Sequence, residues 1–67
     1  MCLETDLSTV TRHIAEAQRL IDRQIELIIG LIEIGSDTTG ARNELEEMRI
    51  NLRSLEACAE ALRETAQ

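Results

Sequence analysis

Apolar residues recur along two long stretches of the chain at alternating spacings of four and three, a heptad pattern typical of helices that pack along one seam. The first stretch predicts a helix over about 6–34, whose seam is Leu3, Leu7, Val10, Ile14, Ala17, Ile21, Gln24, Ile28 and Leu31. The second predicts a helix over about 38–65, whose seam is Ala41, Leu45, Met48, Leu52, Leu55, Ala59, Leu62 and Ala66.

The two stretches are separated by residues 35–40, Gly-Ser-Asp-Thr-Thr-Gly, which favour turns and helix caps over helix interiors. Gly35 should be the C′ residue of the first helix, because glycine adopts the left-handed conformation without a Cβ clash. Asp37 should be the N-cap of the second helix, with Ser36 or Thr38 as alternatives, because its carboxylate can accept a first-turn N–H.

Two seams joined by one short turn, at 35–37, predict an all-α protein. The fold we expect is an antiparallel, coiled-coil-like two-helix hairpin that forms a single domain over residues 1–67. Thr5, Asp6 or Ser8 should cap the first helix at its N-terminus.

The two seams can be paired in a register in which a seam residue always meets a seam residue. The expected layers are Leu31 with Leu45, Ile28 with Met48, Gln24 with Leu52, Ile21 with Leu55, Ala17 with Ala59, Ile14 with Leu62, and Val10 with Ala66. Gln24 is the one polar member, and a lone polar seam residue more often sets register or oligomeric state than binds a ligand.

The first helix is much more apolar over residues 20–34 than elsewhere. At helical pitch the apolar side chains of this segment fill an arc of roughly 220°, which one neighbouring helix cannot cover. The side chains left over are predicted to form an oligomer interface: Leu20, Leu27 and Ile34 on one flank, and Ile25, Ile29 and Ile32 on the other. We therefore expect a homodimer in which two hairpins form a four-helix bundle.

Length and composition agree with this expectation. A chain of 67 residues rarely forms a sufficient core alone, and neither a disulfide framework nor a zinc motif is evident in the sequence. A net charge of −6 and the absence of aromatic residues argue against nucleic acid as a partner. Charged residues interrupt every apolar run, which argues against a membrane span, and residues 1–6 do not resemble a secretory leader. We expect a cytoplasmic protein without a cofactor.

His13 is the first residue with potential chemistry, because Glu16 lies one turn away and Glu60 and Arg63 are expected opposite. A ferritin-like metal site would need Glu-x-x-His motifs and further inward glutamates, and here the order is reversed. A histidine beside a carboxylate on the flank of the seam is the preferred interpretation.

The chain has two cysteines, Cys2 and Cys58. In the expected register Cys2 would lie beyond the end of the second helix, so we expect no disulfide between them within one chain. Cys58 is deep in a helix with acidic neighbours in sequence, so we expect a buried, inert thiol.

Ile50 points away from the seam, beside the small residues Ser54, Ala57 and Ala61. This position is a candidate docking face for another protein or for an oligomer contact.

One set of residues forms a pattern of a helix, a Gly-x-Asp-Thr turn and another helix: His13-Ile14-Ala15-Glu16, Ile21, Gln24, Leu27-Ile28, Leu31, Gly35, Asp37-Thr38 and Ala41. In this pattern the chain resembles a family of short bacterial helical-hairpin proteins without an assigned function. The resemblance covers about residues 11–55 and implies a fold but no activity. The chain departs from the family pattern at Gly40 and in the isoleucine-rich first helix.

No catalytic constellation is evident, so we do not expect an enzyme. The sequence favours a self-associating helical module that acts as a structural or protein-interaction protein, with an adaptor or regulatory role. The alternative is a helical bundle that binds a small ligand or a metal in its interior.

Overall fold

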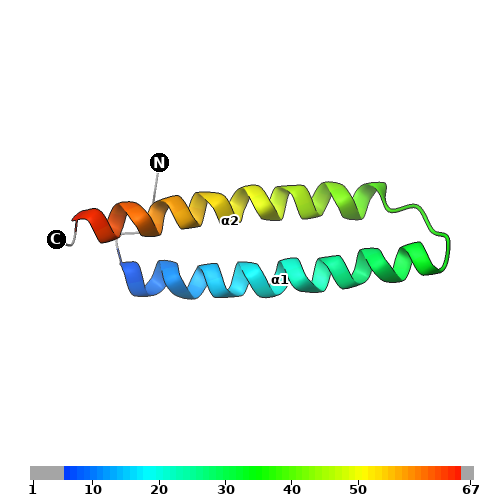
Figure 1. Ribbon diagram of the computed structural model, residues 1–67, viewed down its shortest axis with the longest axis horizontal. Helices are drawn as coiled ribbons and strands as arrows, with labels where there is room; N and C mark the ends of the chain where they lie inside the picture. Colours follow the sequence, from blue (N-terminus) through cyan, green and yellow to red (C-terminus); the bar gives the residue numbers. More distant parts are fainter. Residues whose placement is uncertain (1–5, 66–67) are drawn as a thin grey trace.

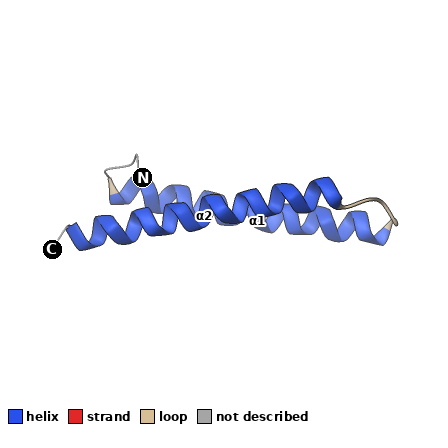
Figure 2. Ribbon diagram, turned by 90° about the horizontal axis from the view of Figure 1, so that it is seen from above, coloured by secondary structure: helices blue, strands red, loops and turns tan. Residues whose placement is uncertain are grey.

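The computed structural model describes residues 6–65 and shows two helices of 27 residues each. Helix α1, Leu7–Glu33, and helix α2, Thr39–Thr65, lie side by side and run antiparallel (Figure 1). Seen from above, they cross each other near their middles, as helices of a coiled coil do (Figure 2). The fold is an all-α two-helix hairpin, with principal extents of 51 × 18 × 13 Å. The connection spans residues 34–38, two residues more than the turn that the sequence predicts.

The N-terminus of α1 is capped by Asp6, one of the three candidates from the sequence. Its backbone is extended, and its Oδ1 accepts a hydrogen bond from the Ser8 N–H at 3.1 Å. The Thr9 hydroxyl donates to Oδ2 at 3.0 Å. The carboxylate thus satisfies a first-turn donor that has no partner within the helix. Thr5 lies outside the described residues.

The C-terminus of α1 ends in a Schellman motif around Gly35. Gly35 has a φ of 71° and donates its N–H to the Ile32 carbonyl at 3.0 Å. Ser36 donates its N–H to the Leu31 carbonyl at 2.9 Å. These two bonds satisfy carbonyls of the last turn, and the left-handed backbone that they need explains the glycine.

At the start of α2 the capping function is divided between two residues. The Thr38 carbonyl accepts the Arg42 N–H at 2.8 Å, so Thr38 occupies the N-cap position. Asp37, one residue earlier, accepts both the Thr39 N–H at 3.0 Å and the Thr39 hydroxyl at 2.8 Å through Oδ1. The backbone hydrogen bond from Thr39, followed by the hydroxyl bond, lowers the pKa of Asp37 below its ordinary value.

The register that the sequence predicts is wrong by one heptad. The Gln24 side-chain amide donates to the Ala41 carbonyl at 2.8 Å and to Glu44 Oε2 at 3.3 Å. A Gln24 level with Leu52 could not make these bonds, because Leu52 is eleven residues, roughly 16 Å, from Ala41 along the helix. The bonds place Gln24 level with Leu45.

Two further observations agree with the shifted register. Val10 packs with Cys58 and Ala59 rather than opposite Ala66, which lies outside the described residues. Figure 1 shows that α1 reaches beyond the start of α2 at the turn, whereas α2 reaches beyond α1 at the other end.

Side-chain size gives the physical reason for the shift. The expected register places Ala17 against Ala59, two small residues that would leave empty space between the helices. In the shifted register Ala17 lies level with Leu52, and Ala59 lies level with Val10. Each alanine then meets a larger side chain, which is how helix seams interdigitate.

All described seam residues are buried or half-buried, but the deepest burial is at the end far from the turn. Val10 is fully buried there and packs with Cys58 and Ala59, and Leu7, Ile14 and Leu62 surround them. Toward the turn the buried side chains are Ala17, Ile21, Gln24 and Ile28, all from α1. Half of the hairpin therefore has a closed core, and the turn half has an open one.

Gly35→Ala should lower the free energy of unfolding by about 1 kcal/mol, because an alanine at positive φ is strained although open space surrounds the position. Gly35→Asn should lower it less, because asparagine tolerates this conformation. Urea unfolding followed by circular dichroism measures both. Equal stability of Gly35→Ala and the wild type would contradict the Schellman geometry.

Asp37→Asn should lower the melting temperature at pH 7 more than at pH 2. The folded-state pKa of Asp37 lies below its unfolded value, so its charged form adds stability above about pH 4, and this stability is lost as the pH falls through the folded pKa. Thermal unfolding of both proteins across this range tests the difference. A constant difference between pH 7 and pH 2 would contradict it.

Candidate interaction surface

Helix α1 exposes most of the large apolar side chains that the fold leaves in contact with solvent. Among the described residues these are Leu20, Leu27, Ile29, Ile32 and Ile34 in α1 and the adjoining turn, and Ile50 in α2. Five of the six side chains predicted for the oligomer interface are thus at least 48% exposed, and the sixth, Ile25, is half-buried. Exposed apolar surface of this extent on one helix points to a partner or to self-association.

Heptad spacing divides this surface into two flanks of α1. Leu20, Leu27 and Ile34 are seven residues apart and form what we call the leucine flank. Ile25, Ile29 and Ile32 lie on the opposite side of the seam and form the isoleucine flank. Because α2 covers mainly the seam between them, the side chains of both flanks stay about half exposed or more, except Ile25, which is half-buried.

Gln24 is the one buried polar side chain among the described residues, with 7% of its surface exposed. Its two hydrogen bonds join α1 to the first two turns of α2. The sequence predicts the polar seam position but not these acceptors, because the predicted register placed Leu52 opposite. The Gln24 amide is therefore directed at α2, and its hydrogen bonds fit the role of setting the register that the sequence predicts.

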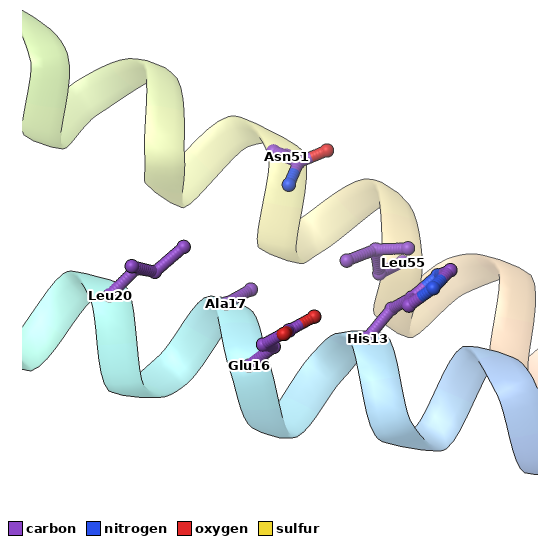
Figure 3. A pocket seen from close by; sticks show the side chains of 6 residues that line it. All are labelled: His13, Glu16, Ala17, Leu20, Asn51 and Leu55. Atoms are coloured by element: carbon purple, nitrogen blue, oxygen red, sulfur yellow. The ribbon is translucent and has the colours of Figure 1, made fainter.

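A shallow hollow of about 250 Å³ lies between the helices on the side of the leucine flank (Figure 3). His13, Glu16, Ala17 and Leu20 line it from α1, and Asn51 and Leu55 line it from α2. The expectation that Glu60 and Arg63 face His13 is wrong, because the register shift brings Asn51 and Leu55 there instead. Nothing in the sequence marks Asn51 as a neighbour of His13 without the correct register.

The described residues contain no group of three or more His, Cys, Asp or Glu side chains that could hold a metal ion. None of the helices within residues 6–65 is both long and apolar enough to cross a membrane.

Cys58 is disulfide-bonded in the structure, so the expectation of an inert free thiol is wrong. Cys2, the chain's other cysteine, lies outside the described residues. Disulfides persist in oxidising compartments and are rare in the cytosol, and the cytoplasmic location stays a prediction.

Ile50 is 56% exposed on α2, on the side away from α1 that the sequence predicts. It is the one large apolar side chain that α2 exposes among the described residues, and single exposed apolar residues are common on protein surfaces. The position by itself does not define a docking surface.

Comparison with known protein families, curated protein sequences and solved structures finds no match to this chain. The resemblance to short bacterial helical-hairpin proteins therefore remains a prediction. The fold and the surface define the class: a two-helix hairpin with an uncovered apolar face on one helix.

Gln24→Glu should lower the free energy of unfolding by about 3 kcal/mol at pH 7. The new carboxylate would be buried against the Ala41 carbonyl and the Glu44 carboxylate, with no donor to pair with. Gln24→Leu should change stability by no more than about 1 kcal/mol, because it removes hydrogen bonds but leaves no buried polar group unsatisfied.

Chemical denaturation at pH 7 and pH 4 measures these effects, with the wild type at each pH as the reference. Burial should raise the pKa of the introduced carboxyl, so Gln24→Glu should regain stability at the lower pH, where its O–H can donate. A Gln24→Glu protein as stable as Gln24→Leu at pH 7 would show that the site is solvated.

Proposed function

We propose that this chain is a non-catalytic protein-interaction module that self-associates through α1 and acts as a structural, adaptor or regulatory protein. The assembly that we propose is a homodimer in which two hairpins form a four-helix bundle. The observation that carries the proposal is the concentration of exposed apolar side chains in residues 20–34 of one helix.

The free energy at stake supports association. Fully burying a Leu or Ile side chain contributes about 1.5 to 3 kcal/mol. Covering three side chains that are about half exposed, on one flank of α1 in each of two chains, would therefore contribute roughly 4 to 9 kcal/mol. This gain is comparable with the whole stability of a small domain. A single hairpin forgoes that stabilisation, whereas a second chain that covers α1 supplies it.

The distribution of burial also supports a partner at the turn half of the hairpin. Within one chain the closed core lies around Val10 and Ala59, not around 20–34. The amides of Ile21 to Ile29 should exchange most slowly with solvent only if another chain covers this part of α1.

A bundle that binds a small ligand or a metal is the second candidate, and the hollow beside His13 is the observation that favours it. Two observations count against a ligand-binding bundle. The hollow is open to solvent, and the Gln24 amide already donates its hydrogen bonds to α2. Native mass spectrometry of freshly purified protein separates the two candidates, because a retained ligand or metal adds mass to the chain.

Light scattering should give twice the 7.5 kDa chain mass at micromolar concentration. Leu27→Glu should give a monomer, because it places a charge in the middle of the proposed interface, and its free energy of unfolding should fall by several kcal/mol. Ile50→Glu is the matched control, since Ile50 is as exposed as Leu27 but lies on α2. A stably folded wild-type monomer would refute the proposal.

A further inference from the structure

The leucine flank continues into a second helical seam when its neighbours on α1 are included. Leu20, Arg23, Leu27, Gly30 and Ile34 recur at alternating spacings of three and four, as the seam facing α2 does. This second seam alternates large apolar side chains with an arginine and a glycine. It is therefore shaped to receive another helix and has none within the hairpin.

Nothing within the single chain explains why residue 30 is a glycine. It lies in the interior of α1, where glycine is less favourable than alanine, and its φ is not positive. A Cβ added there would meet nothing within 4 Å. What glycine does provide at an exposed helix position is close approach of another backbone or of a large side chain.

The second helical glycine lies on the same broad face. Gly40 comes four residues before Glu44, on the side of α2 that also carries Asn51, and Asn51 shares the hollow with Leu20. A Cβ at Gly40 would also meet nothing within 4 Å. Both glycines thus leave room on the face that carries the leucine flank, and neither leaves room on the isoleucine side.

We infer that the partner on the leucine flank is α1 of a second copy, packed antiparallel, with Leu27 of each chain seated on Gly30 of the other. This inference rests on the proposed self-association and adds the face, direction and register of the contact. A two-fold contact is reciprocal, so one large and one small residue on the same helix complement each other twice.

The direction follows from what each arrangement would place in contact. In a parallel pair Leu27 would meet Leu27, Gly30 would meet Gly30, and the two Arg23 side chains would face each other as like charges. In the antiparallel pair Leu27 meets Gly30, and Ile34 meets the aliphatic stem of the partner's Arg23. Antiparallel packing also opposes the helix dipoles.

Gly30→Ala tests whether a second chain packs against Gly30. If it does, the added methyl group should weaken the dimer; if Gly30 faces solvent, the higher helix propensity of alanine should leave the dimer unchanged or make it tighter. Dissociation constants from sedimentation equilibrium should rise at least about tenfold for Gly30→Ala, although alanine favours the helix itself. Gln18→Ala, an exposed polar position on the other side of α1, should leave the dissociation constant unchanged. A Gly30→Ala dimer that is unchanged or tighter overturns the inference.

Leu27→Ser and Ile29→Ser form a matched pair for the choice of flank, because each side chain is 51% exposed in the hairpin. Leu27→Ser should weaken the dimer at least about tenfold, and Ile29→Ser should have no effect. The reverse result assigns the contact to the isoleucine flank and overturns the inference.

Arg23→Ala and Ile34→Ala test the direction. Residues 23 and 34 are roughly 16 Å apart along one helix, so their effects on dissociation should multiply unless they meet across the interface. A double variant that departs from the product of the single effects supports the antiparallel contact, and a simple product overturns it. A monomeric wild type would instead refute the proposed function, and this inference with it.

Discussion

The structure depends on a mismatch between its two helices. Helix α1 presents an apolar arc of roughly 220° over its second half, whereas α2 offers one seam with charged residues beside it, such as Arg42 and Glu44. The contact between the seams is enough to hold a long hairpin, because every described seam residue is buried or half-buried. It is not enough to cover α1, and the uncovered flanks are the consequence.

Within this constraint, side-chain size and one polar contact choose how the helices are aligned. Heptad seams repeat every seven residues, so polarity alone permits more than one alignment. Placing alanines against larger residues closes the space between the helices, as Val10 and Ala59 show at the far end. Gln24 adds a directional restraint, because only one alignment brings its amide to the Ala41 carbonyl. Packing and hydrogen bonding therefore set the alignment of the two helices, whereas the heptad pattern of apolar residues determines where the helices form.

Because helix formation depends on the residue pattern and alignment depends on packing, the sequence predicts some features and not others. The hairpin, the Gly35 turn and the surplus of apolar surface on α1 depend on spacing and local conformation, which are visible in the sequence. The alignment of Ala17 and the neighbours of His13 depend on the volumes that meet across the seam, and a seven-residue slip preserves every polarity match. The disulfide at Cys58 is a third kind of feature, because heptad spacing carries no information about it. The errors in the predicted neighbours of Gln24 and His13 therefore trace to the single error in alignment.

The two halves of the hairpin consequently depend on different sources of stability. Around Val10 the core is complete within one chain, because side chains from both helices are buried there. Around Ile28 the buried side chains come from α1, while Leu27 and Ile29 on either side stay half exposed. If a second copy covers this half, its stability rises with chain concentration, whereas that of the far half does not. Association and local folding at the turn end are then coupled in one equilibrium. The surface that binds the partner therefore also sets the local stability of the turn half of the hairpin.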